Sequence, residues 1–145
     1  MQVMIRKAII KDIGKISQIE RECFSTPWSK EAIMSELEKE NTYMVVAFDG
    51  EELCGYAGMY FVCDEGYITN IAVSENHRRC GIGVCIVEKL LDFSKDHHLS
   101  FLSLEVRKSN FTAIKLYNKM GFVDVGERKN FYVKPTEDAV IMTYY

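Results

Sequence analysis

Two spacings of apolar residues alternate along this chain, one typical of strands and the other of helices. Alternating or continuous apolar runs predict strands over residues 3–9, 43–48, 53–63, 67–73, 101–106, 122–125 and 139–144. Apolar residues three and four positions apart predict helices over residues 12–23, 29–40, 84–93 and 110–120. The predicted order is therefore βααββ followed by βαβαββ.

Residues that favour caps and turns bound these elements. Short polar side chains are expected to cap the starts of three helices, at Asp12, Ser29 and Asn110. Gly121 stands where the last helix needs a C-terminal cap. Turn signals at residues 49–50 and 64–66 separate the strands around them.

The order of the elements predicts a mixed sheet. The strand, helix and strand over residues 67–106 form a crossover unit, which places two parallel strands side by side. The hairpin signal at residues 49–50 predicts antiparallel pairing. We therefore expect an α+β fold with a central, mostly antiparallel sheet, one parallel strand pair and flanking helices. The length favours a single domain over residues 1–145.

Composition narrows the class of partner. Hydrophobic residues make up 48% of the chain, so a core can form without disulfides or a metal. The net charge is −3 and there is no basic block, which argues against a nucleic-acid partner. No apolar run reaches the roughly 18 residues of a membrane helix, and the first residues lack a signal-peptide pattern. We expect a cytoplasmic protein without a membrane partner.

The cysteines do not suggest a disulfide framework or a zinc site. Their number, five, is odd, and no Cys-x-x-Cys occurs. The three histidines also lack metal-ligand spacing, so we expect no metal. Cys54 and Cys63 lie in apolar runs and are expected to be small core residues.

A glycine-containing loop, Arg78-Arg79-Cys80-Gly81-Ile82-Gly83, lies between a predicted strand and a predicted helix. Glycines allow close approach of a ligand to the backbone, and a helix start offers free N–H groups. This combination suits a pyrophosphate, with the arginines adding charge at its edge. The loop lacks the Gly-Lys-Ser/Thr of a P-loop and the third glycine of a dinucleotide fingerprint. The alternative is a tight strand-to-helix turn with solvated arginines.

Three further residues could carry chemistry. Glu105 lies in an apolar strand and should face away from its neighbours Leu104 and Val106. It either faces water or pairs with Arg107, or it serves as a general base at the ligand end of the sheet. Asn110 is a helix cap that could also hydrogen-bond a ligand, and Tyr117 is either a core residue or a catalyst.

These motifs occur together in the order found in one family. They are Ile71-Ala72-Val73, the glycine loop, Leu104-Glu105-Val106-Arg107-Lys108-Ser109-Asn110, Ala113-Ile114 with Leu116-Tyr117, Gly121-Phe122 and Glu137-Asp138-Ala139. Over nearly its full length the chain resembles the GCN5-related N-acetyltransferases (GNAT). Within them it is similar to the bacterial ribosomal-protein-alanine N-acetyltransferases of the RimI type. Thr26-Pro27-Trp28-Ser29 fits the substrate loop of that group.

The resemblance implies acetyl-CoA as cosubstrate. Backbone groups of Ile71 and Val73 would pair with its pantetheine arm like an added strand. Backbone amides of Arg79–Val84 would hold the pyrophosphate. The implied cosubstrate-binding residues are Ile71, Val73, Arg78, Arg79, Cys80, Gly81, Ile82, Gly83, Val84, Asn110 and Tyr117.

The resemblance also implies roles in the reaction. Glu105 would act as the base, through water, on the incoming N-terminal ammonium, and Tyr117 would protonate the departing thiolate. Trp28 and Tyr132 would line the peptide channel. Similar enzymes often carry Tyr-Tyr where this chain has Phe131-Tyr132, so one hydroxyl is missing.

The implied function is direct, base-assisted transfer of an acetyl group to the N-terminal alanine of a small-subunit ribosomal protein. An α-amino group has a pKa of roughly 7.7–8.0, so a modest base can release its lone pair. A covalent route through Cys80 or Cys85 lacks a neighbouring base. Acetylation of a lysine side chain or a small amine remains an alternative, as does a non-catalytic acetyl-CoA-binding scaffold.

Six acidic residues lie on the first two predicted helices. We expect them to lie on solvated helix faces, although together they could attract a basic ribosomal substrate. They are Glu20, Glu22, Glu31, Glu36, Glu38 and Glu40.

Overall fold

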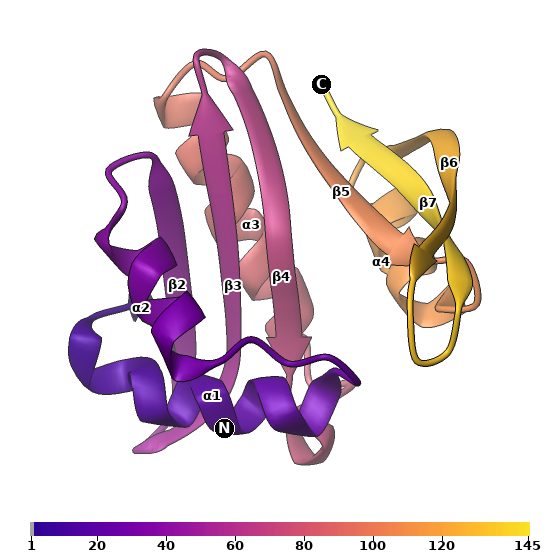
Figure 1. The fold of residues 1–145 in the computed structure, drawn as a ribbon. Helices are drawn as coiled ribbons and strands as arrows, with labels where there is room; N and C mark the ends of the chain where they lie inside the picture. Colours follow the sequence, from indigo (N-terminus) through magenta and orange to yellow (C-terminus); the bar gives the residue numbers. More distant parts are fainter. Residues whose placement is uncertain (1) are drawn as a thin grey trace.

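A twisted mixed sheet forms the centre of the structure, a computed structural model that describes residues 2–145 (Figure 1). Within those residues the sheet has seven strands in the order β1-β2-β3-β4-β5-β7-β6. Every neighbouring pair is antiparallel except β4 and β5. This is the predicted mixed sheet with one parallel pair. Residue 1 of the predicted domain lies outside the described range.

The elements follow the predicted chain order. The strands are β1 (Val3–Lys7), β2 (Thr42–Asp49), β3 (Glu52–Val62), β4 (Glu65–Val73), β5 (Phe101–Arg107), β6 (Val123–Tyr132) and β7 (Glu137–Tyr144). The helices are α1 (Ile13–Cys23), α2 (Lys30–Glu38), α3 (Ile82–Asp96) and α4 (Phe111–Lys119), with short 3-10 turns at Ile10–Asp12 and Glu75–His77. Along residues 2–145, no helix combines the length and apolarity needed to cross a bilayer.

Helices cover both faces of the sheet (Figure 1). Helices α1 and α2 pack on one face through a cluster that includes Ile16, Ile33 and Tyr56. Helices α3 and α4 pack on the other face, where the cluster includes Leu90 and Phe122. Each face therefore has its own apolar core, and the backbone of the sheet separates them.

The parallel pair β4–β5 is short, and this creates an opening in the sheet. Three residue pairs join the strands, from Glu65 with Phe101 to Tyr67 with Ser103. Beyond them the strands diverge, and Figure 1 shows β5 leaning away with β6 and β7. Strand β4 stays paired with β3 as far as Val73, and β5 stays paired with β7 as far as Arg107.

A β-bulge in β4 lies beside this opening. Gly58 of β3 pairs with Asn70 and the next residue, Met59, pairs with Ile68, which leaves Thr69 as an extra residue. One extra residue reverses which face the following side chains occupy. Ile68 accordingly packs in the core under α3 and α4, whereas Ala72 packs in the core under α1 and α2.

The main differences from the predicted boundaries lie in exposed segments. Strand β6 extends to Tyr132, well past the predicted end at residue 125, because its outward positions are polar and carry no apolar signal. The turn between β3 and β4 falls at Cys63 and Asp64, so Glu65 and Gly66 belong to β4. Cys63 is therefore exposed, and its assignment to the core was wrong.

Two of the three predicted helix caps are confirmed. The side chain of Ser29 accepts a hydrogen bond from Ala32 N at 3.1 Å, and Asn110 accepts one from Ala113 N at 3.2 Å. Gly121 follows α4 with φ of 103°, in the left-handed range expected there. Asp12 precedes α1 but makes no side-chain cap to it.

The carboxylate of Asp12 instead fastens β1 to the following turn. It accepts hydrogen bonds from Arg6 Nη1 and Nη2 at 2.8 and 3.0 Å and from Ile9 N at 2.8 Å. These contacts, the Arg6 hydrogen bond first, hold the pKa of Asp12 below its usual value against the opposing effect of burial. The ionised form is thus favoured by folding.

We expect Asp12→Ala to lower the free energy of unfolding by about 1–2 kcal/mol at pH 7, since Arg6 is partly exposed. Because the folded-state pKa is depressed, the stabilisation is present above the unfolded pKa of about 3.9 and disappears as the pH falls below it. Urea unfolding across this pH range measures the difference. Asp92→Ala, on the exposed face of α3, is the matched control. A difference that persists unchanged below the titration range would contradict the assignment.

Candidate active site

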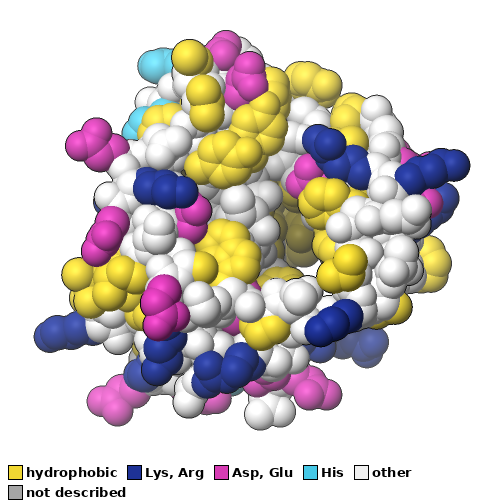
Figure 2. Space-filling view, viewed as in Figure 1, with side chains coloured by type: hydrophobic (Ala, Val, Ile, Leu, Met, Phe, Trp, Pro, Cys, Tyr) yellow, Lys and Arg dark blue, Asp and Glu magenta, His cyan; other side chains and the backbone are white. Residues whose placement is uncertain are grey.

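The opening between β4 and β5 is a cavity of about 310 Å³. Figure 2 shows the same face as Figure 1, hollowed between the two halves of the sheet. The walls come from β4, β5, the α1–α2 loop, the start of α4 and the end of β6. Six of the residues selected from the sequence meet here: Trp28, Ile71, Glu105, Asn110, Tyr117 and Tyr132.

Glu105 faces the cavity from β5, as its alternation with buried Leu104 and Val106 predicted. Its side chain is 29% exposed and accepts a hydrogen bond from Arg128 Nε at 3.1 Å. The expected alternative partner, Arg107, pairs with another acid. The Arg128 side chain is mostly exposed, so water can solvate its guanidinium when the ion pair with Glu105 opens.

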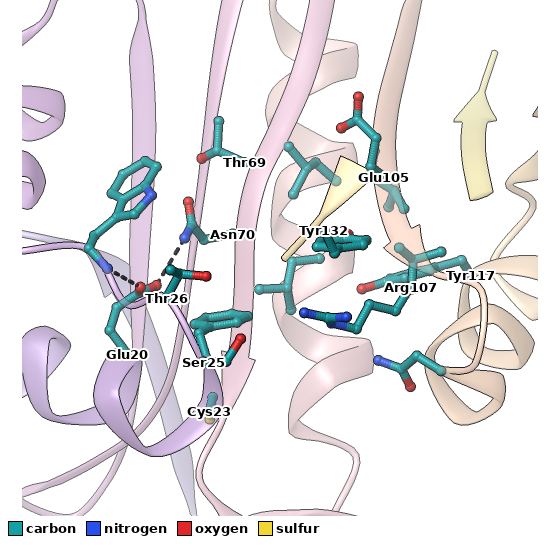
Figure 3. Close-up of a pocket in the computed structure, with 17 residues that line it drawn as sticks. Glu20, Cys23, Ser25, Thr26, Thr69, Asn70, Glu105, Arg107, Tyr117 and Tyr132 are labelled. Atoms are coloured by element: carbon teal, nitrogen blue, oxygen red, sulfur yellow. Dashed lines mark hydrogen bonds between the residues drawn. The ribbon is translucent and has the colours of Figure 1, made fainter. Parts of the chain in front are cut away.

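Two tyrosines stand near Glu105 in the cavity wall (Figure 3). Tyr117 is 7% exposed, and burial raises its pKa above the usual value, so its hydroxyl stays protonated at neutral pH. Burial, followed by the charge of Glu105, raises the pKa of Tyr132 to about 12. Both hydroxyls can therefore donate a hydrogen bond or a proton.

Arg107 fixes the hairpin that carries Tyr132. Its guanidinium donates to Pro135 O at 2.9 Å and Val133 O at 3.1 Å, and pairs with Glu137 at 3.2 Å. Its Cζ lies 4.5 Å from the centroid of the Tyr132 ring. The wall formed by Tyr132 is thus held by one side chain from β5.

The opposite wall is held by a buried acid, Glu20. Its carboxylate accepts hydrogen bonds from Trp28 N at 2.8 Å, from Asn70 Nδ2 at 2.9 Å and from the Tyr56 hydroxyl. Glu20 is only 1% exposed, so its assignment to a solvated helix face was wrong. These bonds join α1, the loop that carries Trp28 and the sheet at the cavity.

The glycine loop lies beyond the C-terminal end of β4, outside the residues that line the cavity. Gly81 is the N-cap of α3 with φ of 80°, a conformation that favours glycine. An added Cβ at Gly81 would meet no atom within 4 Å, and one at Gly83 would meet Leu116 at 3.4 Å. The N-terminus of α3 is therefore open to an anion.

The edge of β4 leads from this loop into the cavity. Ser74 N donates to Cys54 O of β3, so by alternation the backbone groups of Ile71 and Val73 point away from β3, into the opening. Val73 O already accepts from Arg78 Nε at 3.2 Å. The groups of Ile71 and the N–H of Val73 remain for a ligand.

The cysteines and acids of residues 2–145 offer no obvious metal site. Within this range no group of three or more His, Cys, Asp or Glu side chains could hold an ion. Cys80 and Cys85 are both exposed.

Sequence reasoning missed Glu20, Asn70 and Arg107. Glu20 falls seven residues after Ile13 and four after Ile16, so the helical period placed it on the buried face of α1. No comparable signal marks Asn70, because the bulge that aims it cannot be read from the pattern. Arg107 was noticed only as a neighbour of Glu105.

Comparisons with known proteins identify the family of this chain. The sequence pattern described as the Acetyltransferase (GNAT) family matches residues 13–122. A relative from Bacillus subtilis (strain 168) is 38% identical over 141 residues, covering 95% of this chain and 92% of the relative. The "[Ribosomal protein bS18]-alanine N-acetyltransferase" of Haemophilus influenzae is 34% identical over 137 residues and covers 92% of each chain.

Solved structures share the fold. The ribosomal-protein-S18-alanine N-acetyltransferase from Escherichia coli superposes with a TM-score of 0.91 at 30% identity, covering 99% of this chain and 93% of that one. Arabidopsis thaliana NAA60 in complex with acetyl-CoA has a TM-score of 0.91 at 21% identity and covers 99% of each chain, which shows a common fold.

Arg107→Lys should loosen the hairpin that carries Tyr132, because one ammonium cannot replace the planar fork that reaches two carbonyls. We expect a loss of about 1–3 kcal/mol in stability and faster amide exchange over residues 133–137. Thermal unfolding and hydrogen exchange measure the two effects. Arg128→Lys, a change at a more exposed arginine, is the control. Unchanged exchange in the Arg107 variant would contradict the anchoring role.

Proposed function

This chain belongs to the GNAT family of acetyltransferases, and from that premise we propose that it acetylates the N-terminal α-amine of a protein with acetyl-CoA. The observation that carries the proposal is the opening between β4 and β5. It brings a carboxylate, Glu105, and a protonated hydroxyl, Tyr117, to one cavity. We propose that the acceptor is the N-terminal alanine of a small-subunit ribosomal protein, which would be met in the cytoplasm. The names of the Haemophilus influenzae and Escherichia coli relatives support this acceptor.

The residues present fit acetyl-CoA. The backbone groups of Ile71 and the N–H of Val73 would hold an extended arm at the edge of β4. The first N–H groups of α3, from Ile82 to Val84, would hold a pyrophosphate beside Gly81. Asn110 lines the cavity from the start of α4. When bound, acetyl-CoA supplies an activated acetyl thioester.

Glu105 would take the proton from the incoming ammonium. Its side chain faces the cavity and keeps 29% exposure, so water can reach it and relay the proton. An α-amino group needs only a modest base near neutral pH. Release from Arg128 would free Oε1 of Glu105, which now accepts a hydrogen bond from that arginine, to take up the proton.

Tyr117 would supply the proton that the leaving thiolate requires. Burial raises its pKa, so the hydroxyl carries its proton at neutral pH. Its ring packs against Phe122 with centroids 5.7 Å apart, which fixes its direction.

Trp28 and Tyr132 would narrow the entry for the acceptor. They line the cavity from opposite sides. Trp28 is held by the hydrogen bond from its backbone N–H to Glu20, and Tyr132 by the guanidinium of Arg107 over its ring. A narrow entry favours a chain that arrives end-first. Phe131 is 48% exposed, and its ring meets that of Tyr132 edge-on with the centroids 5.0 Å apart. Compared with the Tyr-Tyr pair of similar enzymes, the aromatic ring is kept and one hydroxyl is missing.

The proposed function predicts a preference for small first residues with a free α-amine. Peptides that begin with Ala or Ser should be acetylated faster than matched peptides that begin with Lys or Glu, because Trp28 and Tyr132 would narrow the entry. A lysine inside an N-terminally blocked peptide should react poorly. Mass spectrometry of the products locates the label. Acetyl groups found mainly on internal lysines or free polyamines would favour the alternative acceptors, and no thiol release with any amine would favour a scaffold.

Glu105→Gln keeps the shape of the side chain but removes the base. We expect kcat to fall by about 10²–10⁴-fold, with acetyl-CoA affinity nearly unchanged, because Glu105 acts on the amine. Steady-state kinetics and calorimetry measure the two quantities. Glu127→Gln, which alters an exposed carboxylate on β6, is the control. A near wild-type kcat for Glu105→Gln would leave Glu105 with a structural role.

A further inference from the structure

One buried polar atom at the cavity has no partner. Asn70 is 9% exposed and lines the cavity from β4. Its Oδ1 forms no hydrogen bond with any residue that the structure describes. Buried carbonyl-type oxygens are nearly always paired, so an unpaired one beside an open cavity needs an explanation.

The orientation of this oxygen is fixed by Glu20. A carboxylate oxygen is an acceptor, so the amide group of Asn70 must turn its NH₂ toward Glu20 Oε2, where Nδ2 lies at 2.9 Å. Trp28 N and the Tyr56 hydroxyl also donate to the same carboxylate. No ion pair within residues 2–145 involves Glu20, so these donors alone satisfy it. Turning the amide over would set two acceptors against each other.

The bulge at Thr69 places Asn70 on the face of α1. Without the extra residue, regular alternation would put Asn70 on the same face as Ile68, under α3 and α4, and away from Glu20. Figure 3 shows Asn70, Glu20 and Thr26 on one side of the cavity and Glu105, Tyr132 and Arg107 on the other. Asn70 and Tyr132 thus face each other across the cavity that also holds Glu105 (Figure 3).

We propose that Asn70 Oδ1 accepts a hydrogen bond from the N–H of the first peptide bond of the acceptor. This assignment rests on the proposed function, since it requires a peptide N-terminus. The carboxamide oxygen carries no net charge and suits a peptide N–H, which is neutral at every working pH. A lysine side chain and a simple amine offer no N–H at that distance from the nucleophile, so Asn70 selects for peptide N-termini.

The test uses two peptides that begin with Ala and differ in one atom group. In one, the first peptide bond is intact; in the other it is replaced by an ester, which removes the N–H without adding bulk. Wild type should prefer the amide by about 5- to 100-fold in kcat/KM, the cost of leaving one buried acceptor unpaired. Asn70→Ala should lose a similar factor with the amide peptide and almost none with the ester. The variant-to-wild-type ratio for each peptide cancels their intrinsic difference in reactivity.

Controls separate binding from folding. Asn41→Ala removes another asparagine side chain, one bonded to Phe61 O outside the cavity, and should leave both ratios near one. The KM for acetyl-CoA and the melting temperature are measured for each protein. Asn70→Ser, which keeps a donor toward Glu20, replaces Asn70→Ala if that variant does not fold.

The outcomes are distinct. An Asn70 variant that keeps the wild-type kcat/KM with the amide peptide overturns the role of Asn70 while leaving the proposed function intact. Equal losses of the Asn70 variant with both peptides also overturn it, because the residue would then act only through the fold. A wild-type enzyme that acetylates no peptide N-terminus contradicts the proposed function, and the role of Asn70 with it.

Discussion

The whole arrangement depends on where the ladder of backbone hydrogen bonds stops between β4 and β5. Only three residue pairs join these strands, and their backbone groups would normally continue to pair. The strands can separate because each is held on its other side, β4 by β3 and β5 by β7. The cavity therefore lies within the sheet, and β4 and β5 border it on two sides. A ligand that supplies backbone-like donors and acceptors would complete the interrupted ladder.

Much of this arrangement could be predicted from periodicity, because most elements bury one face. The crossover over residues 67–106 required a parallel pair, and alternation placed Glu105 opposite the core. Strand β6 was too short in the prediction since its exposed residues, as at Asp124 and Glu127, carry no apolar pattern. Cys63 looked like a core residue because an apolar run continues into the turn.

The partners of charged residues were less accessible to sequence reasoning. Arg107 stands two residues from Glu105 and shares its face of the strand, so a pair between them looked plausible. In the structure Arg107 pairs instead with Glu137 of β7. The true partner of Glu105, Arg128, comes from β6 and depends on a sheet order that no local pattern encodes. Glu20 was wrongly expected to face solvent because it is charged, although its spacing from Ile13 and Ile16 places it on the apolar face of α1.

The bulge at Thr69 also bears on how such a site can change over evolutionary time. Side chains along β4 alternate between the two faces of the sheet, and the bulge shifts this alternation by one residue before Asn70. A point substitution at residue 70 changes one donor to Glu20 and one wall of the cavity, but it keeps the alternation of the other side chains on β4. Loss or gain of one residue between 67 and 72 would instead bring a neighbour such as Ile71 to Glu20. The buried carboxylate would then lose a hydrogen-bond donor. Substitutions can therefore vary the chemistry of the cavity wall at residue 70 during evolution, whereas the number of residues in β4 is constrained.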